Sequence, residues 1–219
     1  MAVKIVFKIE IETLFDDKGI LDPAKMENLI MICANLQNSG VRVMLVSSGA
    51  IALGTRRLGK NAPPSGVTAK QATSAVGQAE LIKLYQNYFE DFDQIVAQVL
   101  LTKDVIENPL RNSNAKNTLN RLMEKGIVPV INENDSVSTQ DIILNDNYPL
   151  VLIVATLTDA DAIVVNTFGG EKFELILRDN SDIKIIKTDE LLDLAENFNN
   201  GKIQSDKRIK GFPDYVQSS

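Results

Sequence analysis

Short runs of apolar residues recur from the N-terminus to about residue 166, and few of them alternate with polar residues. The runs that are long enough for strands lie at residues 3–9, 41–47, 95–101, 127–131 and 162–166. A strand with one wet face alternates between apolar and polar side chains, whereas a strand that is buried on both faces is apolar throughout. The pattern therefore predicts five buried strands that lie parallel in one sheet.

Helical segments separate these apolar runs. Asp22 followed by Pro23 is typical of a helix N-terminus, and this helix is expected to continue to about Asn38. Residues 66–90 and 113–125 also have helical periodicity. Strands that alternate with helices over short connections predict an α/β fold, a three-layer α/β/α sandwich with a mainly parallel central sheet.

No internal repeat or low-complexity linker divides the chain, so we expect a single domain over residues 1–219. Charged residues become denser after about residue 168. This softer change in composition indicates a second lobe within the same domain.

The composition is that of an ordinary globular protein, with 44% hydrophobic and 24% charged residues. The net charge of −6 gives no basic field for a nucleic acid or a membrane surface. No apolar stretch reaches the roughly 18 residues of a membrane span, and the apolar start is broken by charges. The lone Cys33, expected at a buried helix position, fits a reducing compartment. We therefore expect a cytoplasmic protein without nucleic-acid or membrane partners.

The chain contains no histidine. This excludes Ser-His-Asp triads, Cys-His dyads and the commonest transition-metal ligand together. Any catalysis must therefore rely on lysines, carboxylates, amides and the backbone, and no metal-ligating residue is predicted.

Small polar residues follow the second predicted strand. Ser48 and Gly49 lie just before a helix that is expected to start near Ala50, so they offer a hydroxyl and unhindered backbone N–H groups to an anion. Ligands of parallel α/β sheets bind at this end of the strands. The alternative is a plain strand-to-helix turn with a serine N-cap.

Amides and carboxylates follow the fourth predicted strand, in the run from Asn132 to Asp135. A plain turn does not need this concentration of polar groups, so the run indicates a second ligand-binding segment. The alternative is a solvated acidic loop.

These segments belong to longer phrases that resemble glutamate 5-kinase, a member of the amino acid kinase superfamily. The phrases have the order and spacing of that family and read VSSGAIALG (46–54), AKQATSAVGQ (69–78), QVLLT (98–102), IVPVINENDSVS (127–138) and NDN (145–147). The resemblance implies transfer of the ATP γ-phosphoryl group to the side-chain carboxylate of L-glutamate, the first committed step of proline biosynthesis, with Mg²⁺. It also implies a glutamate-binding lobe at residues 1–165 and a remnant of a nucleotide lobe at residues 166–219. A homo-oligomer is expected.

The resemblance further implies which residues hold glutamate. Ser48, with Gly49 and Ala50 beside it, would contact the substrate. Asp135 and Asn147 would hold its amino and carboxylate ends.

The resemblance assigns Lys8, Thr167 and Lys207 to the nucleotide. Lys8 and Lys207 would be the catalytic lysines, because phosphoryl transfer depends on positioning and on neutralising the charge of the transferred group. Judged from its position alone, Lys8 is a strand-end lysine in solvent.

The segments assigned to the nucleotide depart from the family pattern. Glu10 replaces a glycine, and Ile11 and Glu12 replace hydroxyl residues. Tyr148 and Phe168 stand where aspartates are expected. The chain ends at Ser219, before the closing part of the family's nucleotide lobe. A carboxylate close to a phosphate charge costs roughly 4 kcal/mol at an effective dielectric constant of about 20. The alternative function is therefore a catalytically impaired pseudokinase that binds glutamate or a protein partner.

Overall fold

The computed structural model describes residues 2–16, 19–138, 148–165 and 185–187. Within these residues six strands form one sheet in the order β3-β4-β2-β1-β5-β6, and all neighbouring strands are parallel. The strands are β1 Lys4–Ile9, β2 Arg42–Ser47, β3 Val96–Leu101, β4 Val128–Glu133, β5 Ala162–Val165 and β6 Ile185–Lys187. The five predicted strands and their parallel arrangement are confirmed, and β6 adds to them.

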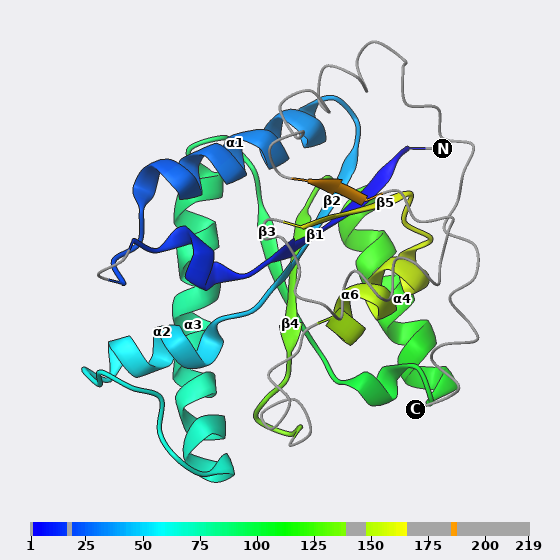
Figure 1. Ribbon diagram of the computed structural model, residues 1–219. Coiled ribbons are helices and arrows are strands. Elements are labelled where there is room, and N and C mark those ends of the chain that lie inside the picture. The colour runs from blue at the N-terminus through cyan, green and yellow to red at the C-terminus, as the bar shows by residue number, and fades with distance from the viewer. Residues whose placement is uncertain (1, 17–18, 139–147, 166–184, 188–219) are drawn as a thin grey trace.

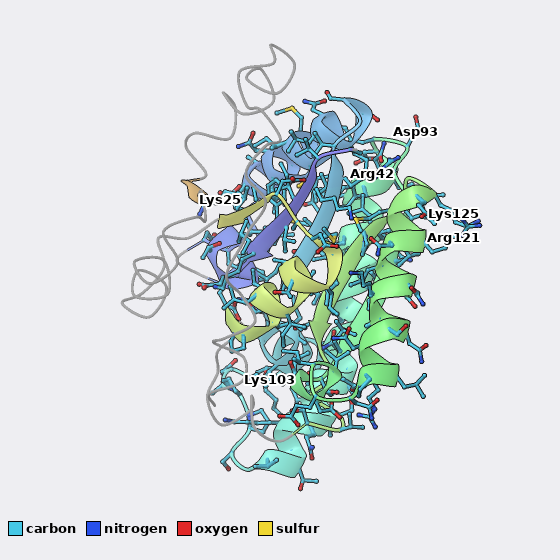
Figure 2. The ribbon with its side chains drawn as sticks, turned by 90° about the vertical axis from the view of Figure 1, so that its right-hand side faces the viewer. Lys25, Arg42, Asp93, Lys103, Arg121 and Lys125 are labelled. Atoms are coloured by element: carbon cyan, nitrogen blue, oxygen red, sulfur yellow. The ribbon has the colours of Figure 1, made fainter. Side chains whose placement is uncertain are left out.

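Helices cover both faces of the sheet. They are α1 Pro23–Asn38, α2 Ala50–Arg57, α3 Val67–Glu90, α4 Pro109–Glu124 and α6 Tyr148–Thr158, with the short 3₁₀ helices η1 Ile11–Leu14 and η2 Lys103–Val105. Figure 1 shows α1 and α3 on one side of the sheet and α4 and α6 on the other. Figure 2 looks onto the side of α4 and α6, where the exposed Arg121 and Lys125 point away from the sheet. The predicted three-layer α/β/α sandwich is confirmed.

The strands are apolar because both faces of the sheet are covered. In β1, Ile5 and Phe7 pack with α1 and α3, whereas Val6 between them packs with α4 and α6. In β2, Leu45 packs on the face of α1 and α3, and Val46 packs on the face of α4 and α6. Neither face needs polar residues, which explains why the sequence shows no alternation.

Side-chain caps fix the start of two helices. The Asp22 carboxylate accepts a hydrogen bond from the backbone N–H of Ala24 at 3.0 Å, and α1 ends at Asn38, as predicted. Helix α4 begins at Pro109 rather than at the predicted residue 113, because the Asn108 side chain caps it in the same way. The Asn-Pro pair was a signal for this start that the prediction did not use.

Helix α6 was not predicted. Its sequence, YPLVLIVATLT, is apolar on all sides, and Val151 and Val154 are fully buried. A helix that is buried all round has no amphipathic pattern, so the sequence pattern did not predict a helix in this apolar run. Among the described helices, none is both long enough and apolar enough to cross a membrane.

Candidate functional site

The carboxyl ends of three neighbouring strands lie side by side, because β4, β2 and β1 are adjacent in the sheet. The pairing of β1 with β2 continues to Ile9 and Ser47, and the backbone N–H of Ser48 donates to the Ile9 carbonyl oxygen at 2.9 Å. Lys8 and Ser48, predicted to face different substrates, therefore lie at adjacent strand ends.

The turn after β2 requires glycine for two reasons. Gly49 has a φ of 98°, in the left-handed region, and a Cβ atom on it would lie 1.8 Å from Cγ2 of Ile11. The serine-cap alternative is wrong, because Gly49 is the N-cap of α2 and no side chain caps the helix there. The hydroxyl of Ser48 instead donates to the Ile9 carbonyl oxygen at 3.4 Å. The first N–H groups of α2 thus have no side-chain acceptor at the cap, which suits an anion.

Tyr85 on α3 holds the residue before this turn. Its hydroxyl lies 2.9 Å from Oγ of Ser47, and both residues are fully buried. Burial raises the pKa of Tyr85 well above its ordinary value, although the hydrogen bond with Ser47 opposes this shift. The phenol therefore stays neutral and remains a hydrogen-bond partner for Ser47.

The backbones of α2 and α3 touch where the two helices cross. A Cβ atom on Gly54 would lie 2.0 Å from the carbonyl oxygen of Thr73, and one on Gly77 would lie 1.6 Å from that of Ala50. Only glycine fits at either position. This contact explains glycines of the VSSGAIALG and AKQATSAVGQ phrases to which the sequence analysis gave no separate role.

The segment after β4 is partly buried. Strand β4 continues to Glu133, so Asn132 and Glu133 are buried in the sheet, and the solvated-loop alternative is wrong for these two residues. Asp135 is half-buried, and its Oδ2 accepts a hydrogen bond from Oγ of Ser74 at 2.5 Å. Directly after Asp135 the segment becomes exposed, at Ser136 and Val137.

Lys8 is buried, with 2% of its surface exposed, so the strand-end alternative in solvent is wrong. Its ammonium group forms an ion pair with the carboxylate of Glu10. A buried charge is tolerated when it has a partner of opposite charge. Glu10, which stands where the family has a glycine, therefore neutralises the buried charge of Lys8. Lys8 is the lysine that the resemblance assigns to the nucleotide.

The segment after β1 covers the turn after β2. Ile11 is fully buried and fills the space beside Gly49, and Oε1 of Glu12 lies 3.5 Å from the place of a Cβ atom on that glycine. The carboxylate of Glu12 thus lies near the N-terminus of α2, where a negative charge is favourable.

Asn147, Thr167 and Lys207 lie outside the described residues, as does Phe168, and Tyr148 is the first residue of α6. Within the part of the chain that the structure describes, no group of three or more His, Cys, Asp or Glu side chains is arranged to hold a metal ion.

Ser74 and Tyr85 are polar contacts that the sequence analysis missed. Both lie on α3 and are fully buried. The signal was their spacing, because residues 71, 74, 78 and 85 lie on one face of a helix and all carry hydrogen-bonding side chains.

Known proteins resemble this chain in sequence and in fold. The sequence model of the amino acid kinase family matches residues 12–170. Glutamate 5-kinase of Clostridium perfringens (strain 13 / Type A) is 39% identical over 188 residues, 84% of this chain and 70% of that protein. Glutamate 5-kinase of Caldanaerobacter subterraneus subsp. tengcongensis is 38% identical over 185 residues, again 84% of this chain but 50% of that protein.

The fold similarity extends to more distant proteins. The solved structure of carbamate kinase from Giardia lamblia bound to AMP-PNP matches with a TM-score of 0.52 at 14% identity, over 76% of this chain and 71% of that one. This likeness concerns the fold alone.

Proposed function

Because the chain belongs to the amino acid kinase family, and within it to the glutamate 5-kinases, we propose that it phosphorylates the side-chain carboxylate of L-glutamate with ATP, a step of proline biosynthesis. One observation carries the proposal. The two segments assigned to glutamate meet on the same short stretch of α3, since Ala50 contacts Gly77 and Asp135 contacts Ser74. Ser74 and Gly77 are three positions apart on α3, which is only about 4.5 Å along the helix axis.

This arrangement suits an amino acid, which carries a negative carboxylate and a positive ammonium group. The start of α2 at Ser48, Gly49 and Ala50 offers backbone N–H groups for a carboxylate. Asp135 offers a negative charge for the ammonium group. Asn147 is proposed to complete the site, and it lies outside the described residues.

The nucleotide is proposed to bind beside this site, with its phosphates at Lys8. The buried ammonium group of Lys8 is one strand away from Ser48, and a phosphate would replace Glu10 as its partner. Lys8 and Lys207 are the proposed catalytic lysines, and Thr167 is proposed to contact the nucleotide. Their positive charges would stabilise the transferring phosphoryl group.

Mg²⁺ is proposed to enter as part of the MgATP substrate. It is usually held by one or two carboxylates together with phosphate oxygens and water, and when bound it neutralises phosphate charge.

The two relatives described above do not favour the pseudokinase alternative, because both are named glutamate 5-kinases. The Lys8–Glu10 ion pair affects the affinity for the nucleotide and not the kind of reaction. A phosphate must compete with Glu10 for the lysine, so weaker nucleotide binding is expected rather than loss of the reaction.

Other features are proposed from the resemblance. Residues 1–165 would form the glutamate-binding lobe and residues 166–219 a remnant of the nucleotide lobe. The protein would be a cytoplasmic homo-oligomer, and the single, buried Cys33 is compatible with a reducing compartment. Sedimentation of the purified chain tests the oligomeric state.

Trapping of the product tests the function. An acyl phosphate reacts with hydroxylamine to form a hydroxamate, so purified protein with L-glutamate, MgATP and hydroxylamine should form hydroxamate in amounts that depend on both substrates. Asp135→Ala should abolish this signal. A control, Thr158→Val, removes a buried hydroxyl that, among the described residues, bonds only within α6 and should keep the signal. No hydroxamate from folded wild-type protein at saturating substrates would contradict the proposal.

A further inference from the structure

One face of α3 donates a row of hydrogen bonds to the segment that runs from Glu133, the last residue of β4, to Ser138. The donors and acceptors are Gln71 Nε2 to the Ser138 carbonyl at 3.5 Å, Ser74 Oγ to Asp135 Oδ2 at 2.5 Å, and Gln78 Nε2 to the Glu133 carbonyl at 3.0 Å. Residues three and four apart lie on the same side of a helix. The helix therefore holds this segment at three places along its length.

Ser74 differs from the two glutamines because it acts on a side chain. The glutamines bind backbone carbonyls, whereas the Ser74 hydroxyl binds a carboxylate oxygen of Asp135. Hydrogen bonds from a hydroxyl to a charged carboxylate are short and strong. Ser74 is fully buried, so its hydroxyl approaches Asp135 from the protein interior.

The helix that carries Ser74 is itself held in place. Gln98 on β3 donates to the Gln78 carbonyl oxygen at 3.3 Å, and Gly77 packs against the backbone of Ala50. Ser74 lies three and four residues before these contacts, one turn away on the same helix. Its hydroxyl is therefore presented to Asp135 from a fixed position.

We propose that Ser74 is a positioning residue, which orients the carboxylate of Asp135 toward the ammonium group of the bound amino acid. This inference rests on the proposed binding of L-glutamate by Asp135. A carboxylate that accepts a hydrogen bond from a fixed hydroxyl keeps a fixed direction, and the site then selects an amino acid over a dicarboxylate of the same length that lacks the amino group.

Ser74→Ala tests the inference through two ligands, L-glutamate and glutarate, measured by calorimetry on the full chain. Glutarate has both carboxylates of glutamate but no ammonium group. The variant should bind L-glutamate about tenfold more weakly, the size of one hydrogen bond to a charged group. Its affinity for glutarate should not change. Ser74→Cys keeps the shape and a weak S–H donor, so it should fall between wild type and Ser74→Ala.

Two further variants separate positioning from general packing. In an Asp135→Ala background, Ser74→Ala should have no further effect on L-glutamate binding. Thr158→Val should leave both affinities unchanged, because the Thr158 hydroxyl donates to the Val154 carbonyl oxygen within α6, at 2.7 Å. Unfolding midpoints of all variants show whether each protein is folded when it is titrated.

Each contrary result has its own meaning. Wild-type L-glutamate affinity in Ser74→Ala, or an equal loss for L-glutamate and glutarate, overturns the positioning role while the proposed function stands. Failure of the wild-type protein to bind L-glutamate overturns the proposed function and the inference with it.

Discussion

Lys8 and Glu10 change the interpretation of the nucleotide side of the site at the scale of single residues. The sequence suggested that Glu10 repels phosphates, and the structure adds that it neutralises the buried Lys8. Both effects weaken nucleotide binding, because Lys8 is engaged and a negative charge is near. Glu10 also stabilises the fold by balancing the buried ammonium group.

Glu10→Gln should therefore separate these effects. We expect ATP affinity to rise about tenfold, equivalent to about 1.4 kcal/mol, because a phosphate no longer competes with a carboxylate for Lys8. The free energy of unfolding should fall by about 1 to 3 kcal/mol, because Lys8 loses its charged partner. Titration calorimetry and urea unfolding measure the two quantities. Glu124→Gln is the matched control, since it removes the carboxylate of an exposed pair with Arg121 and should change neither value by much. Unchanged or weaker ATP binding in Glu10→Gln would contradict this role of Glu10.

Ile11 must be kept when the segment after β1 is restored to the family pattern. Glu10→Gly with Glu12→Ser should recover ATP binding, because both carboxylates are removed. Adding Ile11→Thr should lower the free energy of unfolding by about 2 kcal/mol, because Ile11 is fully buried beside Gly49. Urea unfolding of the two variants compares them directly. Equal stabilities would show that Ile11 is not a core residue.

The crossing of α2 and α3 decides the geometry of the site at the scale of elements. Gly77→Ala places a methyl group against the Ala50 carbonyl oxygen, so the helices must separate. We expect a loss of stability of more than about 2 kcal/mol and weaker L-glutamate binding, since Ala50 begins the helix of the proposed anion site. Gly59→Ala is the control. Its φ of 66° costs about 1 kcal/mol, but a Cβ atom there meets no neighbour, and glutamate affinity should be kept. Wild-type glutamate affinity in folded Gly77→Ala would show that the crossing does not set the site.

The elements that sequence could predict were those with a local signal. The parallel strands have unbroken apolar runs, and α1 has the Asp22-Pro23 start. Helix α6 has no polar face, so nothing in its pattern marked it as a helix. The extension of β4 to Glu133 depends on pairing with Leu101 of β3, a contact that the local sequence does not record.

At the scale of the whole molecule, the site also combines features that have a local sequence signal with features that depend on the folded chain. The turn at Ser48 and the run that ends at Asp135 follow strands, so their sequence positions already placed them at one end of the sheet. The partner of Asp135 could not be predicted, because Ser74 lies 61 residues away in the sequence, on helix α3. Only the folded chain brings the two side chains together. The burial of Lys8 likewise depends on the strands on either side of it.

Cys33 reports on the integrity of the whole core. It is fully buried on α1, and burial raises the pKa of its thiol, which keeps the thiol protonated and unreactive. We expect iodoacetamide to label native protein at pH 8 only as fast as the protein unfolds. Labelling should become fast in 6 M urea. Rapid labelling of the native protein would show that the core around α1 opens without global unfolding.

Binding of L-glutamate to the wild-type chain and to Asp135→Ala tests the central claim most directly. Loss of Asp135 should cost about 2 to 5 kcal/mol, a weakening of at least about 30-fold, because the ammonium group of the ligand is left without a charged partner. Glu124→Ala, at an exposed carboxylate of α4, should bind as wild type does. One-site binding by the wild-type protein, lost in Asp135→Ala, is the predicted result. Equal affinity of folded Asp135→Ala and wild type, measured by calorimetry under the same conditions, would contradict it.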